Sequence, residues 1–351
     1  MAYGVIAALA SAALFGLSTP LAKVLVGTVS PLLLAGLLYA GSGLGLLLVM
    51  VIRRLRAPDD RGLVLPQRGE WPWLLAAIFF GGIAGPVALM AGLVTSAAST
   101  ASLLLNLEGV FTALLAWFVF RENFDRRIML GMAAIIGGGL VLAWSPGVQA
   151  EASLGLMLVV VACLCWAIDN NFTRKVAASD ALMIACVKGL VAGVVNLSLA
   201  SLFGASLPPA GTTAMALALG FVGYGISLVL FVLALRHLGT ARAGAYFSVA
   251  PFFGAALAVA VVGDALTLQL GIAGALMAIG VWLHLTEQHG HRHMHEALAH
   301  EHVHSHDDHH RHPHDFAWNG EEPHAHPHVH APLAHSHAHY PDLHHRHRHP
   351  H

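Results

Sequence analysis

Three ionisable side chains interrupt apolar stretches of this chain at places where a charge is costly. Glu108, Asp169 and Lys188 each lie inside an apolar run of membrane-spanning length, and a charge at the bilayer centre costs at least ~2.5–3.5 kcal/mol. Burial disfavours the charged form of a carboxyl group, which suits reversible protonation near neutral pH. Intramembrane ionisable residues are therefore the first candidates for a substrate or coupling site.

Distances along the helices predict which of these charges meet. Asp169 lies five residues before Arg174, or about 8 Å of helix, and Lys188 lies eight residues after Asp180, or about 12 Å. Because a short turn joins the two helices, we expect antiparallel neighbours with an Asp169–Lys188 ion pair. Such a pair either stabilises the bundle or belongs to a substrate or coupling site.

Glu108 is expected to lie deeper, near the middle of its helix. It precedes Arg121 by 13 residues, or roughly 20 Å of helix. We hypothesise that Glu108 carries a coupling proton or contacts a cationic group of a substrate. The alternative is pairing with Lys188 or hydrogen bonding to neighbouring helices. Asn106 and Asn170 complete the predicted site, although polar side chains at this depth also serve to link helices.

A second kind of chemistry lies in residues 289–351, which hold 24 of the 26 histidines. Most follow the pattern His-x-His, and imidazole is a common ligand of borderline transition metals. Such pairs on a flexible chain can surround an ion with about four ligands, with poor selectivity among nickel, cobalt, zinc and copper. The predicted metal ligands are His300, His302, His304, His306, His309, His310, His335, His337, His339, His344, His345 and His347.

This histidine-rich tail repeats itself with an offset of 35 residues. Its prolines and alternating polar residues leave little to bury, so we expect disorder in the absence of metal. One alternative is a low-complexity tail that binds metal only incidentally. Another is pH sensing, because histidines charge together as the cytoplasm acidifies. We expect no required cofactor; a divalent transition metal in the tail is the one bound group considered.

The chain before residue 287 has the composition of a membrane protein. Of 351 residues, 56% are hydrophobic and only 11% are charged, against about a quarter charged in soluble proteins. A helix of about 20 residues crosses the hydrocarbon core. Ten apolar segments are predicted to do so, at residues 3–26, 30–52, 72–94, 97–120, 126–144, 153–173, 181–203, 212–235, 240–262 and 266–285.

Basic residues lie almost entirely in alternate loops. Twelve follow the second, fourth, sixth and eighth segments, and one, Lys23, lies on the other side, where its long stem can reach the interface. The positive-inside rule then places both termini and the histidine-rich tail in the cytoplasm. The twelve are Arg53, Arg54, Arg56, Arg61, Arg68, Arg121, Arg126, Arg127, Arg174, Lys175, Arg236 and Arg242.

The two halves of the membrane part resemble each other. Since each half has five predicted helices, the second copy must cross the membrane in the opposite direction, which is a transporter architecture. Matching residues at an offset of 142 include Leu93 with Leu235, Phe111 with Phe253, Gly138 with Gly280 and Glu122 with Asp264.

Three stretches carry a family resemblance: Asn106 to Phe124, Gly131 to Trp144 and Val249 to Thr267. With them the chain resembles the drug/metabolite transporter superfamily in its EamA-type branch. Members look like two five-helix repeats whose fourth and ninth helices end in an acid, here Glu122 and Asp264. The resemblance implies a ten-helix inverted-repeat permease of the bacterial inner membrane, usually an exporter of small metabolites.

One departure from the family pattern lies beside the candidate site. The family often has proline where Gly109 stands in the first copy, whereas the second copy keeps Pro251. The resemblance covers residues 3 to 285 and does not identify the substrate. The histidine-rich tail lies outside it.

We therefore predict an all-α polytopic membrane protein with ten transmembrane helices in two inverted five-helix repeats. The first EamA-type repeat is expected at residues 1–146 and the second at 152–286, followed by a disordered cytoplasmic tail at 287–351.

The predicted function is that of an inner-membrane secondary transporter that exports a small metabolite by alternating access, with proton coupling. One alternative is efflux of divalent nickel, cobalt or zinc ions that the tail collects, although the membrane part lacks a His/Asp cluster. Another is a membrane-anchored metal sensor or buffer. We expect no enzyme, because nucleotide-loop, CxxC and nucleophile-elbow motifs are missing from the sequence. The expected partners are a small-molecule or ion substrate and the lipid bilayer, without nucleic acid; a homodimer is left open.

Overall fold

The computed structural model describes residues 2–56, 69–120, 126–144, 150–173, 176, 180–238, 240–286, 290–295, 298–304, 324–330 and 333–338. The chain divides into two compact units, Met1–Glu287 and Gln288–His351. We call the first the membrane unit, and we treat the two units separately.

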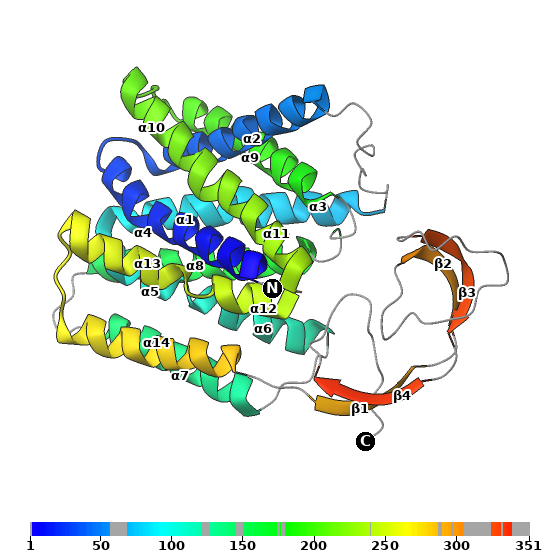
Figure 1. Cartoon of the computed structure of the whole chain (residues 1–351). Coiled ribbons are helices and arrows are strands. Elements are labelled where there is room, and N and C mark those ends of the chain that lie inside the picture. The colour runs from blue at the N-terminus through cyan, green and yellow to red at the C-terminus, as the bar shows by residue number, and fades with distance from the viewer. Residues whose placement is uncertain are drawn as a thin grey trace. The chain divides into compact units, whose positions relative to one another are not determined.

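The membrane unit is helical throughout its described residues (Figure 1). In chain order its helices are α1 (Ala2–Val26), α2 (Pro31–Arg56), α3 (Trp71–Ala77), η1 (Ile78–Ala84), α4 (Gly85–Thr95), α5 (Ala98–Leu104), α6 (Leu107–Phe120), α7 (Arg126–Ala143), α8 (Ala150–Thr173), α9 (Ala181–Leu202), α10 (Ala210–Gly220), η3 (Phe221–Ile226), α11 (Ser227–Leu238), α12 (Thr240–Phe247), α13 (Ala250–Leu257), η4 (Ala258–Val262) and α14 (Leu268–Leu285).

Eight helical stretches in the described residues are long and apolar enough to cross a membrane, and the shorter apolar helices Ala250–Val262 and Leu268–His284 accompany them. Together they occupy the ten segments expected from hydropathy. The eight are Tyr3–Val26, Pro31–Arg56, Trp71–Thr95, Ala98–Leu115, Arg126–Ala143, Ser153–Thr173, Leu182–Leu202 and Ala210–Phe231.

The outer surface of these helices is apolar. Leu48 is 60% exposed, Phe118 73% and Val194 64%. In water such a surface would drive aggregation, whereas lipid tails solvate it at no cost. The membrane unit is therefore a multi-pass integral membrane protein.

Small residues let the helices pack closely in the interior. α2 lies against α9, and α7 lies against α14. Where α2 and α9 cross, Gly43 faces Gly189, and a Cβ on Gly189 would stand 2.6 Å from the Gly43 backbone nitrogen. Close backbone approach through small residues is the usual way in which membrane helices associate, because burial of apolar surface gives little drive in lipid.

Four of the predicted spans are not uniform α-helices. π-helical stretches interrupt two of them at η1 and η3. The span predicted at 97–120 is broken at Leu105 and Asn106, and the one at 240–262 is broken at Ser248 and Val249. Each of these four spans was expected to be one continuous α-helix, and that expectation was wrong.

The described part of the histidine-rich tail forms four short strands, β1 (Gly290–His295), β2 (Leu298–His304), β3 (His324–His330) and β4 (Leu333–Ala338). β1 pairs with β4 and β2 with β3, both antiparallel. A His-x-His alternation repeats every two residues, as a strand does.

Candidate functional site

The break in the fourth span places Glu108 at the start of a helix. α6 begins at Leu107, so Glu108 lies in its first turn, not in mid-helix as expected. α6 has 14 residues, so the break lies roughly 20 Å of helix from the Phe120 end. The partial positive charge of a helix N-terminus favours an acidic side chain there.

Side chains satisfy the backbone groups that this break exposes. The Asn106 amide nitrogen donates to the Leu103 carbonyl at 3.0 Å and approaches the Met277 sulfur at 3.9 Å. The Cys163 thiol donates to the Leu104 carbonyl at 3.5 Å. Asn106 is 5% exposed, and in this structure its role is to stabilise the break.

Glu108 faces α8. The Asn170 amide nitrogen donates to Glu108 Oε1 at 2.9 Å and to Thr112 Oγ1 at 3.3 Å. Asn170 is exposed and Glu108 is half-buried. Within the described residues, no Lys or Arg lies at ion-pair distance from Glu108.

Asp169, the residue before Asn170, forms with Lys188 the ion pair that the sequence predicted. Lys188 Nζ lies 2.6 Å from Asp169 Oδ1 and 2.7 Å from Oδ2. The Thr173 hydroxyl also donates to Asp169 Oδ1, at 2.8 Å. The side chains of Lys188 and Asp169 are 15% and 10% exposed, so the pair is largely desolvated and each charge depends on the other.

The π-helical stretch η1 presents carbonyl groups to the same region. Gly81 O accepts hydrogen bonds from the Tyr39 hydroxyl at 2.5 Å and from Trp166 Nε1 at 3.0 Å. Gly82 O accepts from the Asn196 amide at 3.0 Å. π-helical stretches inside α-helices occur frequently at functional sites, and here α2, α8 and α9 all bond to one.

Gly81 also makes room for the ion pair. A Cβ on Gly81 would stand 1.8 Å from Asp169 Oδ2 and 2.2 Å from its Cγ. The absence of a side chain at position 81 therefore fixes where the Asp169 carboxylate lies.

Aromatic rings extend the site toward α1, α2 and η3. The rings of Phe15 and Tyr224 lie 5.7 Å apart, and those of Tyr39 and Tyr224 lie 5.6 Å apart. Phe15 lies 6.4 Å from Trp166 and 5.4 Å from Phe247. We call these five residues the aromatic cluster. Such faces suit an organic solute or a cation.

We expect Gly81→Ala to destabilise the protein by about 1–3 kcal/mol, because the new methyl group must displace the Asp169 carboxylate. Gly137→Ala is the matched control: it is also a helical glycine, and a Cβ there meets nothing within 4 Å. The control should be neutral or slightly stabilising. Thermal unfolding of the purified protein in detergent measures both, and equal melting of the two variants would show that Gly81 does not position Asp169.

The structure brings together four of the five predicted site residues, Glu108, Asp169, Asn170 and Lys188, and places Asn106 behind them as a cap. Thr112 and Tyr39 were not among the predicted residues, because neither has a charge to single it out. Glu122 lies outside the described residues, as do seven of the predicted metal ligands: His306, His309, His310, His339, His344, His345 and His347. His300, His302, His304, His335 and His337 fall on β2 and β4.

A broken helix, a buried ion pair and a half-buried carboxylate thus lie together inside a helical membrane bundle. Residues 2–144 and 153–286 match the EamA-like transporter family. The chain belongs to that family.

Individual relatives are also similar to this chain. An uncharacterized transporter of Methanothermobacter thermautotrophicus is 26% identical over 294 residues, which cover 80% of this chain and 85% of that protein. A probable amino-acid metabolite efflux pump of Salmonella typhimurium is 32% identical over 167 residues, 46% of this chain and half the length of the pump. A solved crystal structure superposes with a TM-score of 0.60 at 19% identity, over 81% of this chain and 96% of the other, which shows a shared fold.

Proposed function

We propose that this protein exports a small metabolite carrying an amino group from the cytoplasm, in exchange for protons, by alternating access. Glu108 carries the proposal. This residue lies in the first turn of a half-helix inside the membrane, is half-buried, and accepts a hydrogen bond from the exposed Asn170. Discontinuous helices of this kind form substrate and ion sites in transporters.

The internal duplication supports alternating access. At the offset of 142, η1 corresponds to residues 220–226, where η3 lies, and Leu105–Asn106 corresponds to 247–248, beside the second break. Two repeats that share the same irregularities support a pair of inverted five-helix bundles, at 1–146 and 152–286, that rock about a central site.

The orientation follows from the basic loops. With both termini in the cytoplasm of a bacterial cell, α6 and α8 both run toward the cytoplasmic side of the inner membrane. Asn170 lies three residues before Thr173, the end of α8. The approach to Glu108 along Asn170 is then from the cytoplasm, where an exported substrate binds.

The site supports a substrate with an ammonium group. Among the described residues no Lys or Arg lies at ion-pair distance from the Glu108 carboxylate, which can therefore attract a cation. The aromatic cluster can contact that cation through ring faces, and the Asp169–Lys188 pair can orient the polar remainder of the substrate. The name of the Salmonella typhimurium relative agrees with such a substrate.

Coupling follows if proton and substrate exclude each other at Glu108. A proton from outside neutralises the carboxylate, and the arriving ammonium group displaces that proton into the cytoplasm. Substrate then leaves and a proton enters in each cycle.

Uptake of radiolabelled amino-acid metabolites into inside-out vesicles tests the proposal: we expect saturable, pH-gradient-dependent uptake of an amine and none of its N-acetylated form. Equal uptake of both forms would contradict it.

A metal-related role for the tail is the second candidate, and the strand register favours it. β2 and β3 place His300 opposite His328, His302 opposite His326 and His304 opposite His324. Histidines two residues apart share a face of a strand, so the register groups imidazole-bearing positions four at a time. Among the described residues no group of three side chains is already arranged to hold an ion.

Removing the tail separates the two candidates. If the tail only accompanies a metabolite exporter, a chain cut after Glu287 should transport the amine at the full-length rate, within about twofold. Cells with either version should then have equal nickel, cobalt, zinc and copper contents. Metal efflux would be favoured instead if the full-length chain alone lowered metal content and moved metal into inside-out vesicles.

A further inference from the structure

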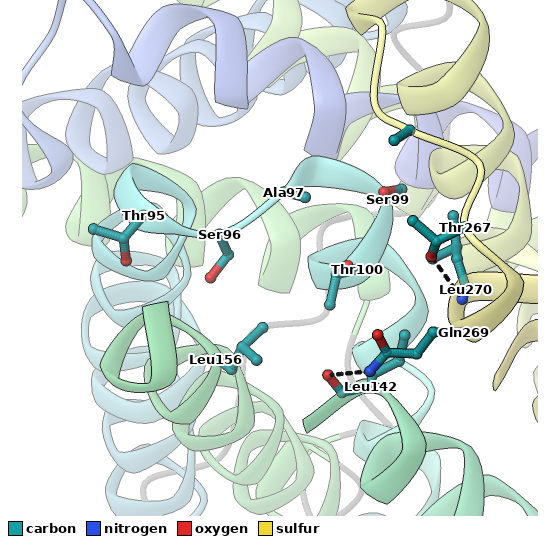
Figure 2. Close-up of a pocket in the computed structure, with 11 residues that line it drawn as sticks. Thr95, Ser96, Ala97, Ser99, Thr100, Leu142, Leu156, Thr267, Gln269 and Leu270 are labelled. Carbon is teal, nitrogen blue, oxygen red and sulfur yellow. Dashed lines mark hydrogen bonds between the residues drawn. The ribbon is translucent and has the colours of Figure 1, made fainter. Parts of the chain in front are cut away.

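The turn between α4 and α5, residues 95–97, lies at the end of the membrane unit opposite to the approach along Asn170. Figure 2 shows this turn beside the start of α14. The charge placement assigns this end to the extracytoplasmic side. Two charged side chains hold the turn, one from each half of the chain.

Lys23 of α1 holds the α4 side of the turn. Its Nζ donates to the Leu93 carbonyl at 2.5 Å and to the Val94 carbonyl at 3.1 Å. These are among the last carbonyls of α4, and a cation is favourable at a helix C-terminus. The expectation that Lys23 merely reaches the interface was therefore incomplete.

Asp264, from the second half of the chain, holds the α5 side. Its Oδ2 accepts a hydrogen bond from the backbone N–H of Ser99 at 2.7 Å. The preceding Gly263 has a φ of +86°, in the left-handed region that glycine adopts at little cost. That turn ends η4 and sets the position of Asp264.

The space beside the turn is incompletely filled, and polar and apolar groups both line it. A cavity of about 260 Å³ is lined by Ser96, Thr100, Thr267 and Gln269 among others, and Figure 2 shows their hydroxyl and amide groups around it. Ser96 is 4% exposed, and its hydroxyl has no hydrogen-bond partner among the residues that the structure describes. Buried polar atoms without a hydrogen-bond partner are uncommon in protein interiors. A second arrangement of the turn can give the Ser96 hydroxyl a partner.

We propose that the α4–α5 turn is the exit gate of the transporter, and that Lys23 and Asp264 are the latch that keeps it shut while Glu108 is accessible from the cytoplasm. The proposal rests on the proposed export function and orientation. Release of substrate requires both contacts to break, and the cavity beside Ser96 gives the turn room to move. Lys23 and Asp264 are thus positioning residues for transport, remote from the substrate.

Cysteine accessibility tests the latch without a known substrate. Cys163, Cys165 and Cys186 are replaced by alanine, and Thr100→Cys reports from the cavity wall to a membrane-impermeant maleimide added outside intact cells. Asp264→Asn removes the charge from one hydrogen bond, and Lys23→Met removes two charge-assisted hydrogen bonds. Either change should speed labelling about tenfold or more. Asp264→Glu keeps the charge and should label at the parent rate, within about twofold.

Thr213→Val is the matched control. It removes a hydrogen bond of 3.1 Å to the Pro208 carbonyl at the same end of the bundle, away from the turn, and labelling should not change. Size-exclusion profiles in detergent confirm that each variant folds. Unchanged labelling in both folded latch variants would overturn the proposal, as would labelling from the cytoplasmic side alone. If the latch variants speed labelling but vesicles transport no amine, the proposed function is wrong and the proposal of a gate is still supported.

Discussion

Replacing Lys188 with methionine should destabilise the protein by about 3–5 kcal/mol and abolish transport. The substitution leaves Asp169, whose side chain is 10% exposed, without its cation, and breaking a buried ion pair from one side costs this much. Asp169→Asn should have a similar effect through the unpaired lysine. Thermal unfolding in detergent measures stability, and vesicle uptake measures transport.

The double variant Asp169→Asn/Lys188→Met separates structure from function. Removing a buried pair completely is often neutral for stability, so melting should return to within about 1 kcal/mol of the parent. If the pair orients substrate, uptake should stay at least about tenfold below the parent rate, a loss of ~1.4 kcal/mol in transition-state stabilisation. A stable double variant that transports at the parent rate would reduce the pair to a structural element.

Glu108→Gln should uncouple transport. Glutamine keeps an oxygen that can accept the Asn170 hydrogen bond, seen at 2.9 Å, but it neither binds a proton reversibly nor attracts an ammonium group. We expect uptake of the amine to fall about tenfold or more, and the remaining uptake to lose its dependence on the pH gradient. Initial rates in proteoliposomes with and without a pH gradient give both results.

Gly109→Ala provides the control beside Glu108. It lies on the same half-helix, and a Cβ there meets nothing within 4 Å, so coupling and rate should stay within about twofold of the parent. If Glu108→Gln retained normal uptake across pH, Glu108 could not be the proton carrier. If Gly109→Ala abolished uptake as well, the effect would belong to α6 as a whole.

The spans could be predicted from the sequence because apolar runs of the right length leave few alternatives. The break at Leu105 and Asn106 could not, since the usual signals are missing: neither position is glycine or proline, and Gly109 stands where the family often has proline. Pro251, at the start of α13, does mark the corresponding break in the second half. The second break therefore carries a local signal in the sequence, and the first does not.

Of the site, the Asp169–Lys188 pair was predicted correctly, but the expectation that its two helices are packed neighbours was wrong: α8 and α9 each pack against η1, and the side chains of Lys188 and Asp169 meet beside it. The surroundings of Glu108 were not. The depth of Glu108 was counted from Arg121 and that of Asp169, the neighbour of Asn170, from Arg174, as if both helices ended at one level. The contact between Glu108 and Asn170 shows that α6 runs further than α8, so counting from the helix ends placed Glu108 too deep.

In the proposed cycle a proton and the ammonium group of the substrate compete for the Glu108 carboxylate. Proton release on substrate binding, measured with a pH dye in weakly buffered detergent solution, tests it most directly. The parent protein should release close to one proton for each amine bound near the pH at which Glu108 titrates, and Glu108→Gln should bind more weakly and release none. Binding of the amine without proton release, or equal release from Glu108→Gln, would contradict the account.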